Sequence, residues 1–388
     1  MRRLPLSASV AASISGLALL LGAVEPASAE PRPALRRARL EAPVPKEHGS
    51  TPPRLEVQEV AATGSMPKGA LLSPDGTRVY VTSFGQLDRK NVTVLDARTL
   101  ALVDTIDVPG NVVESAISPD GKTLYLSNFR RSSVMFVDVA SHRVVREIKT
   151  GKHPKVLALS PDGKSLFAAN WAAHSVSRID VASGQVVQTL GAGRQPRGMV
   201  VTRGGKLVIA NFWGASLDVY DGKDLASHHR VTACDNPRHL ALSPDHGTLY
   251  VSCLRASEIE AVDLSTETVT HRVKVGAAPK SIEVSRDGRF VWSADYGVSR
   301  SVSVVDTRSW TSRVFPVPGM DRGSGVAVAP DGRHAVVTGW YDAHAYLVGF
   351  AGEGGHPEAA RRAISAWKAR PFHDDPPPTE EAPAVAVR

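Results

Sequence analysis

Cysteine and aromatic residues are scarce in this chain. Its 388 residues include two cysteines, and only 6% are aromatic, whereas 42% are hydrophobic. Two cysteines are too few for a disulfide scaffold, or for a zinc or iron–sulfur site built from cysteine alone. The hydrophobic share excludes a chain that is disordered throughout. With 32 glycines and 27 prolines, the composition favours many turns joining short elements over a bundle of long helices.

Compact catalytic motifs are also missing. The sequence has no H-E-x-x-H pair, no G-x-S-x-G elbow, no phosphate-loop lysine motif and no repeated calcium-loop signature. We therefore expect neither a metal nor another cofactor. The net charge of +7 leaves about +5 on residues 54–350, which is too weak by itself to indicate a nucleic-acid partner.

The first 29 residues have the pattern of a cleaved secretory signal peptide. Arg2 and Arg3 precede an apolar stretch centred on residues 16–21, and Ala27-Ser28-Ala29 supplies the small residues of a cleavage site. An uncleaved membrane anchor over residues 7–24 is the alternative. We expect cleavage after Ala29 and a periplasmic or secreted protein.

Both ends of the mature chain have the composition of flexible segments. Residues 30–53 are rich in proline and arginine, which predicts a disordered linker. Residues 351–388 predict a short helix followed by a disordered tail. The folded domain is therefore expected to span residues 54–350.

A turn signal recurs seven times in residues 54–350, at spacings of 41 to 45 residues. Proline suits the second position of a tight turn, and glycine suits the position that needs a positive φ. Each signal therefore predicts a hairpin between two strands, and we call these hairpins the anchors. They begin at Ser73, Ser118, Ser160, Thr202, Ser243, Ser285 and Ala329.

Four short strands can be read in each repeat. In the third repeat they cover residues 155–160, 165–170, 175–180 and 185–190. Four antiparallel strands per unit of about 42 residues are typical of propeller blades. The last repeat lacks a fourth strand, and residues 54–60 form an alternating strand with no blade of its own. We predict an all-β, monomeric, seven-bladed β-propeller whose N-terminal strand completes the last blade.

The second strands carry a repeated Tyr-Val-Thr-Ser-like motif, as in Val79-Tyr80-Val81-Thr82-Ser83 and Leu249-Tyr250-Val251-Ser252-Cys253. In this the chain resembles the YVTN-repeat propellers of bacterial periplasmic and archaeal surface proteins, specifically the YncE-like group. The resemblance covers roughly residues 55–350. It implies a non-enzymatic binding or surface protein, with nucleic-acid binding proposed for some members, and related propellers include lactonases.

Two rings of side chains are expected on the face opposite the anchors. Five positions before an anchor, five of the seven repeats carry a basic residue that follows a proline, and these five residues should form a collar around the channel mouth. Directly after the second strands, six of the seven repeats carry an aromatic residue. The basic residues are Lys68, Lys155, Arg197, Arg238 and Lys280, and the aromatic ones are Phe84, Phe129, Trp171, Phe212, Tyr296 and Trp340.

Such a face would suit an anionic ligand or partner. Single-stranded nucleic acid is one such partner, since its bases would stack on exposed rings. Two other interpretations remain open for the side chains: the rings could wedge between blades, and the basic residues could be solvated turn residues. Two other functions also remain open. One is a lactonase-like hydrolase using His239, Arg238 and Glu114, and the other is a scaffold that contacts envelope proteins.

The same face carries histidines and two cysteines. His153, His174, His239 and His344 could bind metal or move protons, but no compact ligand motif connects them, and we expect surface or capping roles. Cys234 lies in a loop between blades, and Cys253 ends a second strand of the same blade. In an exported protein this placement predicts a disulfide closing a loop of about 19 residues.

Overall fold

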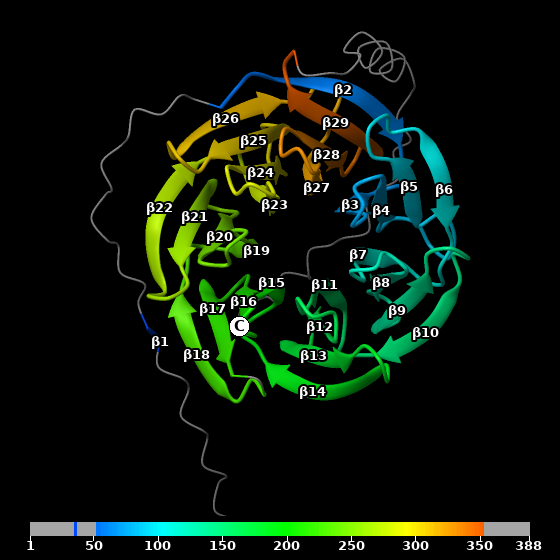
Figure 1. Ribbon diagram of the computed structural model, residues 1–388, viewed down its shortest axis with the longest axis vertical. Helices are drawn as coiled ribbons and strands as arrows, with labels where there is room; N and C mark the ends of the chain where they lie inside the picture. The colour runs from blue at the N-terminus through cyan, green and yellow to red at the C-terminus, as the bar shows by residue number, and fades with distance from the viewer. Residues whose placement is uncertain (1–34, 37–51, 223, 353–388) are drawn as a thin grey trace, which may run out of the picture. The chain divides into compact units, whose positions relative to one another are not determined.

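The computed structural model describes residues 35–36, 52–222 and 224–352, and it is a seven-bladed β-propeller. Seven antiparallel sheets of four strands surround a central axis (Figure 1), and the described residues contain no helix. No segment among them is therefore a helix that could cross a membrane. The predicted signal peptide, nearly all of the predicted linker, and the predicted C-terminal helix and tail lie outside the described residues.

Each blade runs from its innermost to its outermost strand in chain order. Blade 1 comprises β3 (Pro67–Leu72), β4 (Arg78–Ser83), β5 (Val92–Asp96) and β6 (Leu102–Ile106). Blade 2 comprises β7 (Val112–Ile117), β8 (Thr123–Asn128), β9 (Ser133–Asp138) and β10 (Val144–Lys149). Blade 3 comprises β11 (Pro154–Leu159), β12 (Ser165–Asn170), β13 (Ser175–Asp180) and β14 (Gln185–Gly191). Blade 4 comprises β15 (Pro196–Val201), β16 (Leu207–Asn211), β17 (Ser216–Asp221) and β18 (Ser227–Thr232). Blade 5 comprises β19 (Pro237–Leu242), β20 (Thr248–Cys253), β21 (Glu258–Asp263) and β22 (Thr268–Lys274). Blade 6 comprises β23 (Pro279–Val284), β24 (Phe290–Asp295), β25 (Ser301–Asp306) and β26 (Thr311–Pro316).

Blade 7 is closed by the N-terminal strand, as predicted. Its strands are β27 (Gly323–Val328), β28 (His334–Gly339) and β29 (His344–Phe350), and β2 (Leu55–Ala62) pairs with the outer side of β29. Leu55 lies opposite Phe350, and Ala62 lies opposite His344. Innermost strand β27 also contacts β3 and β23, so the two ends of the ring are joined.

The anchors are built as the sequence predicts. In the first of them, the Ser73 hydroxyl donates to Asp75 Oδ1 and accepts the amide N–H of Arg78, while Asp75 Oδ1 accepts the amide N–H of Thr77. Gly76 has a φ of +73°, and a Cβ there would lie 2.6 Å from Cγ of Pro330 in the neighbouring anchor. The glycine is therefore required both by the turn and by contact between blades.

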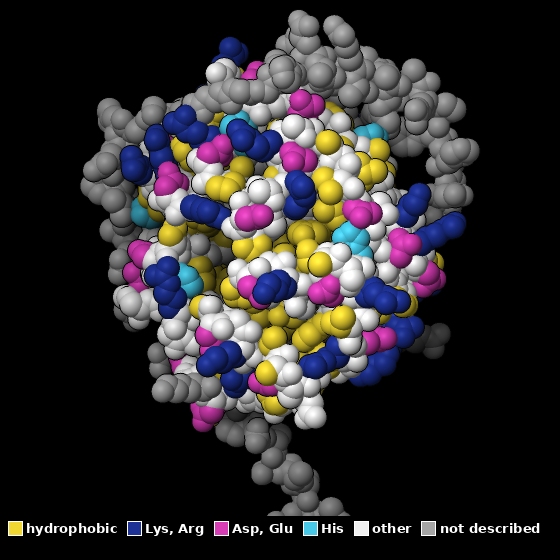
Figure 2. All heavy atoms as spheres, turned by 45° about the vertical axis from the view of Figure 1, so that its right-hand side comes forward, with side chains coloured by type: hydrophobic (Ala, Val, Ile, Leu, Met, Phe, Trp, Pro, Cys, Tyr) yellow, Lys and Arg dark blue, Asp and Glu magenta, His cyan; other side chains and the backbone are white. Residues whose placement is uncertain are grey.

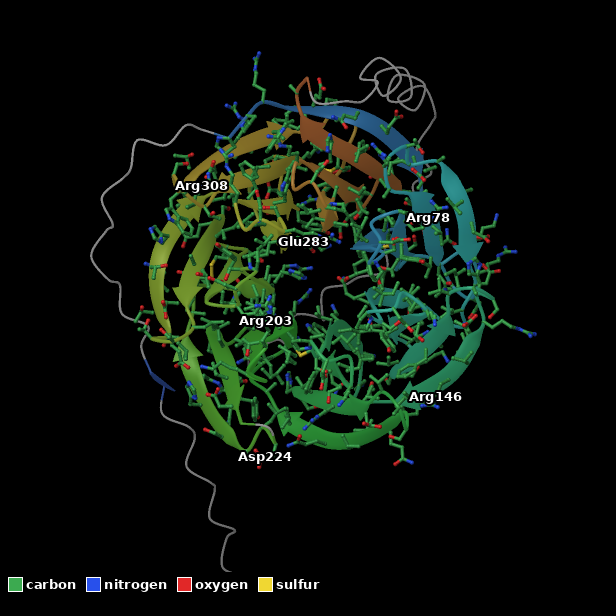
Figure 3. All side chains as sticks on the ribbon, in the orientation of Figure 1. Arg78, Arg146, Arg203, Asp224, Glu283 and Arg308 are labelled. Atoms are coloured by element: carbon green, nitrogen blue, oxygen red, sulfur yellow. A yellow bond between two sulfur atoms is a disulfide. The ribbon has the colours of Figure 1, made fainter. Side chains whose placement is uncertain are left out.

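Side chains between neighbouring blades form the hydrophobic core. One cluster between blades 6 and 7 includes the fully buried Trp292 and Tyr346, and equivalent clusters lie between the other blades. Figure 3 shows Glu283 of β23 and Arg203 of the fourth anchor near the axis, whereas Arg78 and Arg146 lie towards the periphery. Apolar contact between the faces of neighbouring sheets, rather than one central core, therefore stabilises the ring.

A short additional strand departs from the expected linker. Residues Leu35–Arg36 form β1, which pairs in parallel with β18 on the outer edge of blade 4. The composition of residues 30–53 predicted disorder throughout, and these two residues differ because an outer strand offers unpaired backbone groups to any extended segment nearby.

Candidate anion-binding site

One face of the propeller consists of the loops that join successive blades and the loops that follow each second strand. We call it the loop face. In all seven blades the amide after the second strand donates to the carbonyl of the residue that precedes the innermost strand. Examples are Trp171 to His153 (3.0 Å) and Trp340 to Arg322 (2.9 Å). This repeated bond, followed by a proline in five blades, sets where the next side chain points.

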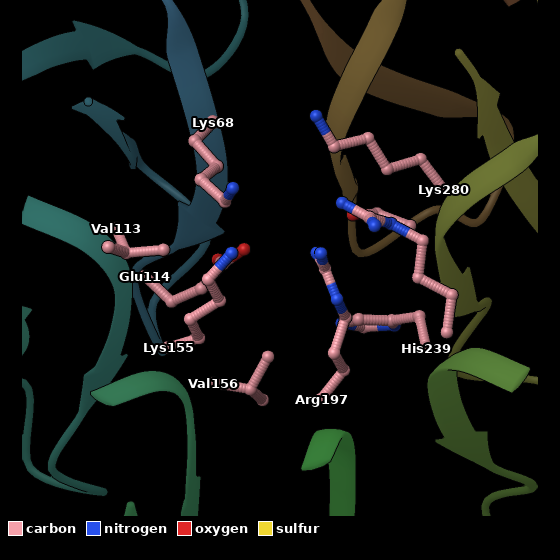
Figure 4. A pocket seen from close by; sticks show the side chains of 10 residues that line it. Lys68, Val113, Glu114, Lys155, Val156, Arg197, His239 and Lys280 are labelled. Atoms are coloured by element: carbon pink, nitrogen blue, oxygen red, sulfur yellow. The ribbon is translucent and has the colours of Figure 1, made fainter. Parts of the chain in front are cut away.

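The five basic residues named from the sequence line a single pocket on the axis. Its cavity volume is about 20 Å³, and its remaining lining residues include Val113, Glu114 and His239. Figure 4 shows the labelled lysines and Arg197 extending from different blades towards one another. We call the five residues Lys68, Lys155, Arg197, Arg238 and Lys280 the collar.

Aromatic rings lie directly against the collar cations. Lys155 Nζ lies 4.4 Å from the ring centroid of Trp171, and Lys280 Nζ lies 4.2 Å from that of Tyr296 and 4.0 Å from that of Trp340. The Arg197 guanidinium lies 4.6 Å from the ring centroid of Phe212. The three collar lysines are at most 3% exposed. Cation–π contact partly offsets the cost of burying these charges.

The six aromatic residues named from the sequence are not an exposed stacking surface. Phe84, Phe212 and Trp340 are buried, and Phe84 and Trp340 pack together against Val113. Phe129, Trp171 and Tyr296 are half-buried. These rings separate neighbouring blades and support the collar, which was the alternative interpretation of the pattern.

The exposed aromatic residues of the loop face lie one position further along the chain. Trp213 is 47% exposed and Tyr341 is 40% exposed, and each directly follows a buried ring. Neither was expected from the sequence, because both lie one residue beyond the repeat position at which six of the seven blades carry a ring. The adjacent aromatic pairs Phe212-Trp213 and Trp340-Tyr341 were the available signal.

The collar is incomplete on one side. Blades 2 and 7 supply Val113 and Ser324 at the collar position, and both side chains are fully buried. Glu114, the residue after Val113, supplies the only carboxylate among the residues that line the pocket. The pocket therefore has five basic side chains and one acidic side chain.

His239 lies in the same pocket as Arg238 and Glu114, the other two residues of the hydrolase hypothesis. Its Nδ1 accepts a hydrogen bond from the amide of Ile282 (3.4 Å). Burial, together with the charge of Arg238, lowers the pKa of His239 to about 4. A histidine with that pKa is neutral at pH 7 and is a weak general base.

The other three histidines considered in the sequence analysis, His153, His174 and His344, do not line this pocket. His153 stacks on Phe129 with ring centroids 4.1 Å apart, and burial lowers its pKa. His174 Nδ1 accepts the amide of Gln195 (3.0 Å), and His344 Nδ1 lies 2.5 Å from the carbonyl of Asp342. Each therefore has a local structural contact.

One cluster with metal-ligating side chains lies away from the pocket, at the junction of blades 4 and 5. It contains Asp221, His229 and Glu267. Lys206 Nζ lies 3.6 Å from Asp221 and 3.5 Å from Glu267, and His229 Nε2 lies 2.8 Å from Glu267. These contacts make it an ion-pair network with its own cationic partner.

The last residue of the second strand is buried in every blade but differs in chemistry. Asn170 donates to Ser175 and Ser177. In blade 5 the structure joins Cys253 to Cys234 by a disulfide bond. In blade 6 this residue is Asp295, which accepts hydrogen bonds from three serine hydroxyls at 2.7 to 2.8 Å, and burial raises its pKa to about 7.

These features define a seven-bladed propeller with a basic axial pocket. The family model described as YNCE-like beta-propeller matches residues 146–340, about half of the chain. The chain therefore belongs to the YNCE-like beta-propeller family. The model described as a seven-bladed lactonase propeller matches residues 56–203, and that match includes Glu114 but ends before Arg238 and His239.

A curated relative is more distant. The chain is similar to Antigen Lp49 of Leptospira interrogans, with 29% identity over 96 residues. The match covers 21% of this chain and 21% of that protein, so this chain spans about a fifth of the relative's length.

Proposed function

We propose that this propeller binds a compact anionic ligand in the axial pocket and performs no chemistry on it. The observation that carries the proposal is the convergence of five basic side chains from five blades on one axial pocket. Like charges held together repel, and a bound anion offsets that repulsion at the place where desolvation makes it strongest. The narrow space among these side chains favours a small polyvalent anion over a stacked oligonucleotide.

The supporting experiment measures anion binding by calorimetry at low salt, with pyrophosphate and citrate as probes. Lys155→Met and Lys280→Met should each weaken binding at least tenfold. Lys164→Met is the matched control, because Lys164 is exposed in an anchor on the opposite face. No binding by the wild type, or equal weakening by the control, contradicts the proposal.

Single-stranded nucleic acid is tested in the same way. With about five phosphate contacts, the slope of log K against log salt should be about −3.5 for an oligonucleotide. A compact ligand predicts instead that an oligonucleotide competes weakly with pyrophosphate. A steep slope and tight oligonucleotide binding would move the proposal from a compact anion to a nucleic acid.

A lactonase-like hydrolase is the second candidate, favoured by the match to the lactonase propeller model and by the shared pocket of His239, Arg238 and Glu114. The low pKa of His239 argues against efficient base catalysis at neutral pH. Lactone hydrolysis that is lost in His239→Ala but retained in Lys68→Ala would select the enzyme. Failure of both assays would favour the scaffold for envelope proteins.

A further inference from the structure

Exposed large apolar side chains occupy only two regions of the described residues. Six of ten lie on the outer strands β6, β10, β14 and β26. The other four lie on the loop face, in the loops that follow the second strands of blades 1, 4, 6 and 7. They are Leu87, Trp213, Val298 and Tyr341, with exposed fractions of 43%, 47%, 85% and 40%.

Two of the four loop-tip side chains, Trp213 and Tyr341, have an arginine nearby. The Arg255 guanidinium lies 5.9 Å from the ring centroid of Trp213, and the Arg322 guanidinium lies 5.8 Å from that of Tyr341. The loops of this face hold nine lysines and arginines against five aspartates, of which Asp342 is buried. Figure 2 shows basic and acidic side chains interspersed with hydrophobic ones on the surface it presents.

The arrangement around the ring limits what could contact all four tips. Their loops follow β4, β16, β24 and β28, which lie on different sides of the central axis (Figure 1). A peptide in a groove would reach neighbouring tips only, whereas a flat partner meets tips on several sides at once. Tryptophan and tyrosine with nearby arginine are also the side chains that favour the interface between lipid headgroups and acyl chains.

We propose that the loop face docks on an anionic lipid bilayer, with Leu87, Trp213, Val298 and Tyr341 entering the interface and the loop arginines contacting the headgroups. Juxtaposed basic residues add electrostatic attraction that falls with salt, and the apolar tips add a contribution that does not. This inference concerns the rim of the face and does not depend on a ligand in the collar pocket.

The test is cosedimentation of the full chain with vesicles of phosphatidylcholine containing 30% phosphatidylglycerol, and with vesicles of phosphatidylcholine alone. We expect binding to the anionic vesicles that is at least tenfold tighter than to the neutral ones and that weakens with salt. The double variant Trp213→Ala/Tyr341→Ala should bind anionic vesicles at least tenfold more weakly. Val187→Ser, on outer strand β14 and 56% exposed, is the matched control and should bind as the wild type does.

Two outcomes overturn the inference. One is equal binding by the wild type and the double variant when their thermal unfolding is the same. The other is no vesicle binding by a wild type that binds polyglutamate, which would assign the face to an acidic polypeptide. Pyrophosphate binding by the double variant should stay within twofold of the wild type, so this inference and the proposed function can fail separately.

Discussion

The anchors and the loop face both recur once in every blade, but equivalent positions keep the same residues in most anchors and change from blade to blade on the loop face. In five anchors a serine hydroxyl donates to the aspartate two residues later, at 2.5 to 2.6 Å. On the loop face, the last residue of the second strand is a serine, an asparagine, a disulfide cysteine, a buried aspartate or a glycine. A turn that closes on itself needs the same residues every time, whereas a position that meets a neighbouring blade changes with its neighbour.

Opening the ring should have the largest effect, because it tests whether both faces depend on closure. Deleting residues 54–62 removes β2 and leaves the outer side of β29 unpaired. We expect loss of the cooperative unfolding transition, measured by circular dichroism during heating. An unchanged midpoint of thermal unfolding would mean that the blades are stable without closure. Neither the anchors nor the loop face would then depend on the closed ring.

Asp295→Asn tests the most divergent strand end of the loop face. The folded pKa of Asp295 is about 7, above its unfolded value of about 4, so between pH 4 and 7 the folded protein holds a proton that the unfolded chain has released. Stability from this group is therefore present at low pH and falls by about 1.4 kcal/mol per pH unit across that window. The stability of the asparagine variant relative to the wild type should therefore rise between pH 4 and 7.

Urea unfolding at pH 4.5, 6 and 8 measures this difference. The gain should grow with pH and level off above pH 7. A difference that stays constant across the three pH values would show that Asp295 does not titrate in this window.

Removing the disulfide tests the strand end of blade 5, where Cys253 occupies the position that asparagine holds in blades 2, 3 and 4. The bond between Cys234 and Cys253 closes a loop of 19 residues. Cys234→Ser/Cys253→Ser should lower the free energy of unfolding by about 3 kcal/mol, since the unfolded chain gains conformational freedom. Guanidinium unfolding of the variant and the oxidised wild type gives the value. A loss below about 0.5 kcal/mol would mean that local packing alone holds this strand end.

Glycine-to-alanine substitutions in single anchors should have the smallest effect on stability. Two such variants distinguish strain within the turn from contact between neighbouring blades. Gly76 and Gly205 both have positive φ, but a Cβ at Gly76 meets Pro330, whereas nothing lies within 4 Å of one at Gly205. We expect Gly76→Ala to cost about 2 kcal/mol and Gly205→Ala about 1 kcal/mol. Thermal unfolding of both variants checks the ranking. Equal losses would mean that the anchors act only as local turns.

The fold was predictable from the sequence because its signals are local and repeated. The strands expected in the third repeat at residues 155–160, 165–170, 175–180 and 185–190 agree with β11 to β14 to within one residue at each end. Hairpin closure of these strands depends on the turn residues of each anchor, and five of the seven anchors contain both a proline and a glycine. The pairing of β2 with β29 was predictable for a related reason, since the last repeat lacks a strand and the N-terminal strand lacks a blade.

The site was predictable only in part. The repeat position of Lys68, Lys155 and Lys280 could be read from the chain, but whether a ring is buried depends on the neighbouring blade. Phe212 is buried and the adjacent Trp213 is exposed, although both are aromatic residues of one four-residue loop. The pKa shifts of Asp295 and His239 likewise arise from burial, which exists only in the folded ring.

The sequence by itself determined the number of blades, the two strands that each anchor joins and the strand that closes the ring. Turn chemistry and the alternation of apolar residues depend only on residues that are close together in the chain. Only the tertiary structure decided that five basic side chains from five blades meet in one small pocket, that aromatic rings lie beneath them, and that Trp213 and Tyr341 remain exposed. Burial and electrostatic environment depend on residues that are far apart in the chain, and the closed ring is what brings those residues together.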